Sequence, residues 1–184
     1  MSDLDGDRKL SKLSDEELMQ SFKEGETLAF RELFERYKNP VFAFVRRRVN
    51  DTGRAEEITQ DIFLALVQRR NGYEARARFR TYLYKIALNR VAEEHRKRGR
   101  SEPLASSSEA TGGGDPSLVQ QVREALGKLE SEQREVVLLR EYEGLSYQEI
   151  SQVLGVPVGT VRSRLSRAKL ALRDLLAPTW AEGA

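Results

Sequence analysis

Leu145-Ser-Tyr-Gln-Glu-Ile-Ser-Gln-Val-Leu-Gly-Val-Pro-Val-Gly-Thr-Val-Arg-Ser-Arg-Leu-Ser-Arg-Ala-Lys169 is the segment that decides how this chain folds. Its pattern predicts two short helices joined by a glycine turn. Ser146 can cap the first helix, and Glu149 three residues later completes a capping box. Gly155 stands where a left-handed residue is favoured after a helix end. The second helix then begins near Val158, which gives the segment the form of a helix-turn-helix.

The second predicted helix carries cations and no acids. Between Val158 and Arg173 there are five Lys and Arg residues and no Asp or Glu. The positions expected to face inward are Val161, Leu165 and Ala168, and those on other faces are Arg162, Ser163, Ser166, Arg167 and Lys169. A helix N-terminus also favours phosphate, so this helix is predicted to enter the major groove of DNA. The alternative is an amphipathic hairpin with a solvated basic face.

Composition narrows the possible functions. The 184 residues suffice for one domain or two small ones, and a net charge of +2 predicts little by itself. The chain has no cysteine and one histidine, His95, in a charged stretch, so disulfides, cysteine zinc sites and Cys/His nucleophile pairs are excluded. No metal, cofactor or catalytic residue is expected. Neither a signal-peptide core nor a membrane-length apolar run is found, which predicts a soluble intracellular protein.

Helical periodicity runs through nearly the whole chain, and no alternating strand pattern is found. Helices are expected at 14–23, 28–49, 54–68 and 79–98, and Pro40 is expected to bend or break the second. Serine, glycine and proline then dominate, which predicts a linker. The fold class is therefore all-α, with two small domains. The predicted parts are a disordered tail (1–12), a helical domain (13–98), a flexible acidic linker (99–117), a second helical domain (118–177) and a tail (178–184).

A basic block with interleaved aromatic residues lies in the first domain. From Arg69 to Arg100 there are eleven Lys and Arg residues against three Glu. Cations beside stacking surfaces are typical of single-stranded nucleic acid binding. Tyr73 is a candidate for an exposed stacking residue, and Asn89 for a residue that reads a base edge. For Phe79 a core position is favoured, and Asn89 alternatively is a plain surface residue.

The third predicted helix has a different character. Its start is acidic, and Gln60, Asp61, Leu64 and Gln68 are expected to form a semi-polar surface. An acidic helix beside a DNA-binding block is not expected to touch phosphate. Contact with a protein partner and a solvated face that complements the helix dipole are equally compatible with this pattern.

Six segments in a fixed order carry a resemblance to a known family. They are Ala29–Tyr37, Ala55–Phe63, Phe79–Arg90, Leu126–Leu139, Gly144–Ile150 and Pro157–Lys169. With them the chain resembles, from about Leu13 to Leu176, bacterial sigma factors of the extracytoplasmic-function (ECF) type in the sigma-70 family. The loop Tyr73–Phe79 and Ser166 depart from the usual family pattern, so the promoter sequences cannot be copied from relatives.

The resemblance implies a noncatalytic initiation subunit that binds core RNA polymerase and directs promoter-specific transcription, as in stress responses. Its first domain would recognise and open the −10 element, and its helix-turn-helix would bind the −35 element. The implied partners are the coiled coil of the largest polymerase subunit, the β flap, duplex and single-stranded promoter DNA, and an anti-sigma factor. No membrane insertion is implied. The expected location is the bacterial cytoplasm, either at the nucleoid in the holoenzyme or held at the membrane by the anti-sigma factor.

Matching positions in the family assign three sets of residues. For −35 DNA they are Thr160, Arg162, Ser163, Ser166, Arg167 and Lys169. For −10 recognition and melting they are Tyr73, Arg76, Arg78, Arg80, Tyr82, Lys85 and Asn89. For core polymerase they are Gln60, Asp61, Leu64, Leu129 and Val137, and several apolar residues on the β-flap side are also expected in the core.

Two other classes of protein compete with this interpretation. An ordinary DNA-binding regulator with an N-terminal dimerisation or ligand module would bind a palindromic duplex without a partner. A nucleic-acid-processing enzyme would need a phosphate loop, a metal cluster or a nucleophile pair, none of which the sequence contains.

Overall fold

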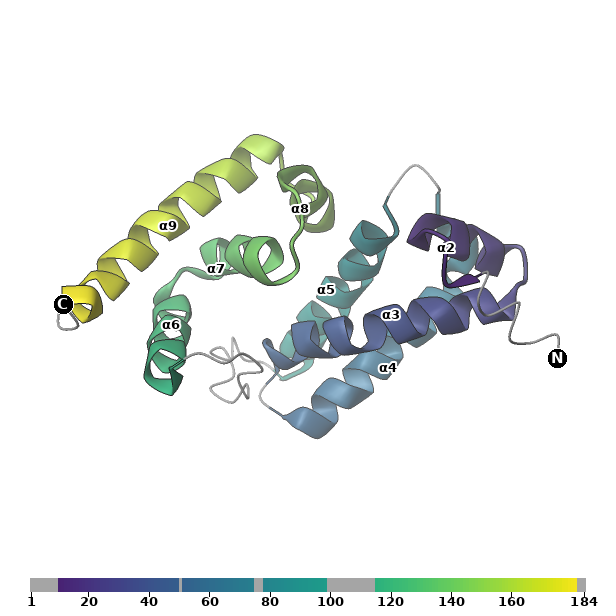
Figure 1. Cartoon of the computed structure of the whole chain (residues 1–184), viewed down its shortest axis with the longest axis horizontal. Coiled ribbons are helices and arrows are strands. Elements are labelled where there is room, and N and C mark those ends of the chain that lie inside the picture. The colour runs from purple at the N-terminus through teal and green to yellow at the C-terminus, as the bar shows by residue number, and fades with distance from the viewer. Residues whose placement is uncertain (1–9, 50, 75–77, 99–114, 182–184) are drawn as a thin grey trace. The chain divides into compact units, whose positions relative to one another are not determined.

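A computed structural model describes residues 10–49, 51–74, 78–98 and 115–181, and within these ranges the chain forms helices and turns without a strand. The chain divides into two compact units, residues 1–102 and 103–184 (Figure 1). The predicted all-α class is confirmed. The predicted linker lies outside the described residues as far as residue 114.

In its described residues, the first unit is a bundle of the helices α2 to α5 with one short turn. Its elements are α2 (Asp15–Lys23), α3 (Thr27–Arg46), α4 (Thr52–Gln68), the 3₁₀ turn η1 (Arg70–Gly72) and α5 (Phe79–Arg98). α2 opens with the predicted capping box: Ser14 Oγ accepts a hydrogen bond from the Glu17 amide at 3.2 Å, and the Glu17 carboxylate accepts one from the Ser14 amide at 2.7 Å. Pro40 does not break α3, because Val41 and Phe44 on the following turn are fully buried and hold that turn against the core.

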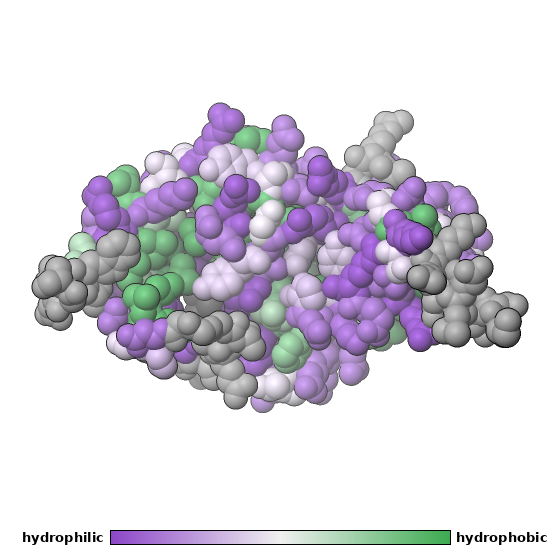
Figure 2. Space-filling model, in the orientation of Figure 1, coloured by the Kyte–Doolittle hydropathy of each residue, from purple (hydrophilic) through white to green (hydrophobic). Residues whose placement is uncertain are grey.

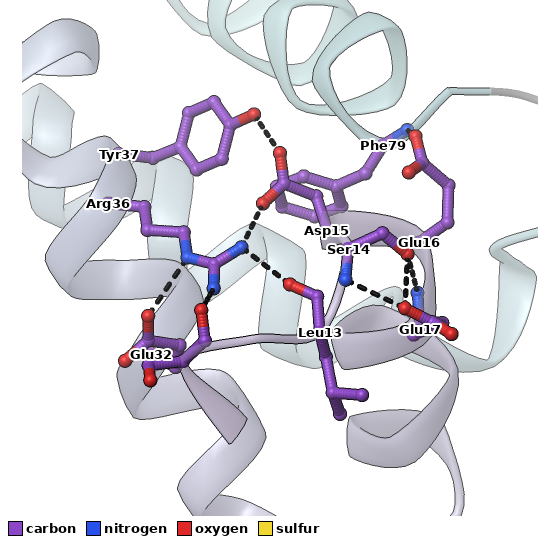
Figure 3. Close-up of polar contacts among 10 residues, drawn as sticks. Leu13, Ser14, Asp15, Glu16, Glu17, Glu32, Arg36, Tyr37 and Phe79 are labelled. Carbon is purple, nitrogen blue, oxygen red and sulfur yellow. Dashed lines mark hydrogen bonds and ion pairs between the residues drawn. The ribbon is translucent and has the colours of Figure 1, made fainter. Parts of the chain in front are cut away.

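The end of the predicted N-terminal tail is attached to α3. The Arg36 guanidinium donates to the Ser11 carbonyl at 2.8 Å and to the Leu13 carbonyl at 3.0 Å, and it pairs with Asp15 and Glu32 (Figure 3). Residues 11 and 13, at the boundary of the predicted tail, are therefore hydrogen-bonded to the half-buried Arg36 of α3, a contact that a sequence pattern cannot show.

Between residues 115 and 181, the second unit forms four helices and a π-helical segment. They are α6 (Pro116–Lys128), α7 (Ser131–Val137) with its π-helical continuation η2 (Leu138–Tyr142), α8 (Tyr147–Leu154) and α9 (Val158–Ala181). α6 begins two residues before the predicted domain start because Asp115 caps it, accepting from the Ser117 amide at 2.9 Å. α9 continues past the predicted end at residue 177. Leu139, Leu145, Ile150 and Val161 form the fully buried centre of this unit.

Hydrophobic side chains reach the surface unevenly. In Figure 2 the face over α2 to α5 is largely hydrophilic, whereas apolar side chains show among the helices of the second unit. Three leucines of this unit are substantially exposed: Leu118, Leu170 and Leu175. In the first unit, Leu64 on α4 is 58% exposed.

Candidate nucleic-acid and polymerase interfaces

The turn between α8 and α9 is fixed by local hydrogen bonds. Ser146 Oγ accepts from the Glu149 amide at 3.2 Å, and the Glu149 carboxylate accepts from the Ser146 amide at 2.8 Å. Gly155 has φ of 67°, in the left-handed region that a side chain disfavours. Ser151 then donates its hydroxyl proton to the Val156 carbonyl at 2.6 Å. The predicted caps and glycine turn are confirmed, and together they set the angle at which α9 leaves α8.

α9 presents the predicted face to solvent. Val161, Leu165 and Ala168 are buried. The exposed residues on the other faces are Arg162, Ser163, Ser166, Arg167 and Lys169, and Thr160 is half-buried. Ser163 donates its hydroxyl proton to the Thr160 carbonyl at 3.0 Å. No ion pair engages Arg162, Arg167 or Lys169 within the described ranges. These three cations therefore remain available to an anionic ligand.

Arg164 has a different role from its neighbours on α9. Its guanidinium pairs with Glu132 of α7 at 2.6 Å, and its side chain is only 18% exposed. Arg173 likewise pairs with Asp174 at 2.9 Å. Two of the five cations that mark this helix in the sequence are thus engaged within the unit. Sequence spacing does not reveal the pairing of Arg164, because Glu132 is distant in the chain.

The predicted exposure of Tyr73 is wrong. Its side chain is 1% exposed, and its ring lies edge-on to Phe79 at 6.5 Å and to Tyr82 at 5.4 Å. Burial, helped by the nearby Glu16 and Asp15 carboxylates, raises the pKa of Tyr73 to about 12. The short turn η1 directs this residue inward, so a polar local sequence gave a misleading signal. Phe79 is fully buried, as predicted.

The other described −10 candidates lie on α5, except Arg78, which directly precedes this helix. Arg78, Lys85 and Asn89 are exposed, and Arg80 and Tyr82 are half-buried. Tyr82 donates its hydroxyl proton to the Arg69 carbonyl at 3.0 Å, which holds its ring beside the end of α4. Because residues three and four apart share a helix face, Tyr82, Lys85 and Asn89 form one stripe. Arg96, seven residues after Asn89, is exposed on the same stripe and was missed, although its spacing signals it. Arg76 lies outside the described residues.

An acidic and partly apolar face lies on α4. Gln60, Asp61, Leu64 and Gln68 are all exposed, so the predicted semi-polar surface exists. At the start of this helix the Arg54 guanidinium binds Glu94 of α5 with two hydrogen bonds, of 2.9 and 2.6 Å. This bidentate pair joins α4 to α5, so the exposed face of α4 and the stripe Tyr82, Lys85 and Asn89 lie on two helices that are joined directly.

Leu129 and Val137 are core residues rather than surface residues. They are 4% and 6% exposed. The Arg134 guanidinium donates to the Leu126 carbonyl at 3.1 Å and to the Leu129 carbonyl at 2.8 Å, which closes the corner between α6 and α7 over them. As isolated contact residues for a partner they are therefore poor candidates. An apolar residue in a helical pattern does not reveal whether it meets the core or a partner.

Two other kinds of site are absent from the described part of the chain. No group of three or more His, Asp or Glu residues there is arranged to hold a metal ion. Its helices include none with the length and apolar character needed to span a bilayer.

Comparison with known proteins matches both units. The sigma-70 region 2 family model matches residues 33–101, and the sigma-70 region 4 model matches residues 119–172. The RNA polymerase sigma factor CarQ of Myxococcus xanthus is 34% identical over 86% of this chain and 95% of its own length. The ECF RNA polymerase sigma-E factor of Escherichia coli K12 is 29% identical over 90% of this chain and 96% of its own.

Solved structures show the same likeness. The sigma factor RpoE of Bartonella quintana, solved with the anti-sigma factor NepR, has a TM-score of 0.70 and 26% identity, and the match covers 80% of this chain and 96% of that one. CnrH, solved with the cytosolic domain of CnrY, has a TM-score of 0.71 and 27% identity, over 89% and 97% of the two chains. With both family regions matched in order along one all-helical chain, this protein belongs to the ECF sigma factors of the sigma-70 family.

Proposed function

We propose that this sigma factor reads promoters through two separate surfaces, α5 for the −10 element and α9 for the −35 element. Family membership establishes the coarser function, which is that of a noncatalytic subunit for promoter-specific transcription initiation. The observation that carries the finer proposal is the outer face of α9. Arg162, Arg167 and Lys169 are exposed there, and the helix has no Asp or Glu between Val158 and Arg173.

The α8–α9 motif fits duplex DNA. A second helix of this kind lies in the major groove with its N-terminal residues against base edges. Arg162 stands in the second turn of α9, where an arginine reaches a guanine edge, and Ser163 and Ser166 lie beside it. Arg167 and Lys169 are further along the helix and suit phosphate contacts. A base contact of this type discriminates by about 1–3 kcal/mol, and phosphate contacts add affinity without specificity.

The α5 stripe fits an opened strand. Extruding a base costs a few kcal/mol, which a stacking contact worth about 1–3 kcal/mol per base offsets. With Tyr73 buried, the half-exposed ring of Tyr82 is the stacking surface. Lys85 and Asn89 follow on the same face as a phosphate contact and a base-edge donor and acceptor. Arg78 and Arg80 add positive charge at the start of the helix.

The polymerase contacts are assigned to exposed residues of both units. On α4, Gln60, Asp61 and Leu64 offer a polar rim around an apolar side chain, which is the usual composition of a protein interface. In the second unit the exposed leucines Leu118 and Leu170 replace Leu129 and Val137 as candidates for the β flap. The similar RpoE of Bartonella quintana was solved with the anti-sigma factor NepR, which supports an anti-sigma partner for this chain as well.

Transcription in vitro tests this proposal. Bacterial core polymerase and this protein are given a library of random promoter fragments, and transcript starts are mapped. Starts that depend on the protein and share two spaced motifs are expected. Arg162→Ala should relax one −35 position, whereas Arg173→Ala, whose arginine pairs with Asp174 on the same helix, serves as the matched control. A chain that directs no start with matched core, and that alone binds a palindromic duplex, would instead be a DNA-binding regulator.

A further inference from the structure

The start of α5 lacks any acidic residue of its own. Its first turn contains no Asp or Glu, and Arg78 and Arg80 flank Phe79, the first residue of the helix. The first amides of a helix have no partner within it, and its N-terminus carries a partial positive charge. Two local arginines are therefore unfavourable at this end. An acid in the same place would relieve the charge but would also repel DNA.

The missing carboxylate comes from α2. Glu16 Oε1 accepts a hydrogen bond from the Phe79 amide at 3.0 Å, across 63 residues of sequence. Figure 3 shows the Glu16 side chain extended toward that amide, beside the Ser14–Glu17 capping box of its own helix. Glu16 thus caps α5 from a neighbouring helix and places a negative charge at two helix N-termini at once.

The neighbouring residues of α2 and α3 brace this contact. Asp15 accepts hydrogen bonds from the Tyr37 hydroxyl and from Arg36, the latter at 2.8 Å. The Tyr37 ring in turn packs edge-on against Phe79, with 5.2 Å between the ring centres. The first turn of α2 is therefore fastened to α3, and both elements contact Phe79.

The other end of α2 contacts η1 and Tyr73. Lys23 Nζ donates to the Tyr73 carbonyl at 3.0 Å, and the Arg70 guanidinium lies 5.6 Å from the Phe22 ring centre. The position of Tyr73 in turn limits that of Tyr82, because the two rings pack edge-on with their centres 5.4 Å apart. Glu16 and Lys23 are thus both linked to Tyr82. Glu16 is linked to it through the start of α5, and Lys23 is linked to it through Tyr73.

We propose that Glu16 and Lys23 are positioning residues for −10 recognition, which set the place of the Tyr82 ring without touching DNA. This inference rests on the proposed function, in which Tyr82 stacks on the opened strand. Small displacements of such a ring change how well each base fits, so α2 contributes to −10 base preference.

The test compares Glu16→Ala and Lys23→Met with Glu24→Ala and Lys12→Met, which remove exposed charges nearby. Each complete chain is assembled with core polymerase and given promoters varied at every −10 position. Glu16→Ala and Lys23→Met should reduce the preference at one −10 position about 3- to 10-fold and leave the −35 preferences unchanged. The controls should retain both sets of preferences. Equal losses on every promoter would overturn the proposal, because a general folding defect predicts that result.

Two further measurements separate positioning from stability. In a Tyr82→Ala background, Glu16→Ala should no longer alter −10 preference; independent effects would refute the link to Tyr82. Amide exchange at Phe79 should accelerate about 10-fold in Glu16→Ala, as expected for loss of a hydrogen bond to a charged group, and less in Glu16→Gln, which keeps an acceptor. Unchanged exchange would refute the cap itself. Exchange does not depend on transcription, so it still reports on the cap if the wild-type chain directs no start and the proposed function fails.

Discussion

Replacing Arg164 with alanine should weaken the second unit without changing the salt dependence of DNA binding. The Arg164–Glu132 pair spans α7 and α9 at 2.6 Å, with side chains 18% and 66% exposed. Because Glu132 is largely solvated, the pair belongs to the surface class, worth about 0.2–1 kcal/mol. For a unit of this size, that loss lowers the melting temperature by about 1–8 °C.

The salt dependence separates this arginine from its neighbours. Each phosphate contact contributes about 0.9 to the slope of log affinity against log salt. Arg167→Ala should therefore reduce the slope by about 0.9, equivalent to about 3.5-fold between 50 and 200 mM salt, whereas Arg164→Ala should leave it unchanged. The assay titrates promoter DNA with holoenzyme across that salt range and records thermal unfolding of each complete chain.

A double-mutant cycle with Glu132→Ala completes the experiment. The two single variants should lose similar stability, and the double variant should lose little more, because the same pair is removed in each case. A slope that falls by about 0.9 in Arg164→Ala would show that this side chain contacts phosphate. Arg164 would then bind DNA rather than Glu132 in the holoenzyme, and the structural role assigned to it would be refuted.

Three further predictions concern the remaining surfaces. Arg162→Ala should cost about 1–3 kcal/mol at one −35 position only, measured by competition among promoters that differ there. Leu64→Ala should weaken binding to core polymerase, measured by fluorescence titration, with folding stability changed by less than about 0.5 kcal/mol because this side chain is 58% exposed. Arg54→Ala leaves the Glu94 carboxylate, 7% exposed, without its bidentate partner. It should cost about 2–3 kcal/mol in urea unfolding, below the 3–5 kcal/mol of a fully buried pair.

Features specified by neighbouring residues were predictable from the sequence. The capping boxes at Ser14 and Ser146 and the left-handed Gly155 each depend on residues within a few positions, and the structure has all three. The buried stripe Val161, Leu165 and Ala168 follows from helical spacing. Pro40 is an exception, because a proline in a helix interior is expected to bend or break the helix. Packing of the following turn keeps α3 continuous, although one backbone donor is lost.

Features specified by distant residues were not predictable. Tyr73 reads as a loop residue beside Asn71 and Gly72, yet Lys23, Phe79 and Tyr82 hold it inside the first unit. The Lys23–Tyr73 hydrogen bond joins positions 50 residues apart and the Glu16–Phe79 hydrogen bond joins positions 63 apart, so no short window of sequence contains them. The consequence is functional, because the stacking role proposed for the −10 element moves from Tyr73 to Tyr82.

The sequence also does not show which cations are paired with acids that are distant in the chain. A run of Lys and Arg without acids predicted DNA binding by α9, but it did not distinguish Arg162, which is exposed, from Arg164, which meets Glu132. Arg54 and Glu94 repeat the point in the first unit, since both look like solvated charges and together join α4 to α5. Charge patterning therefore predicts which helix faces a nucleic acid. The tertiary partners decide which of its cations stay free, and hence how many phosphates the helix can neutralise.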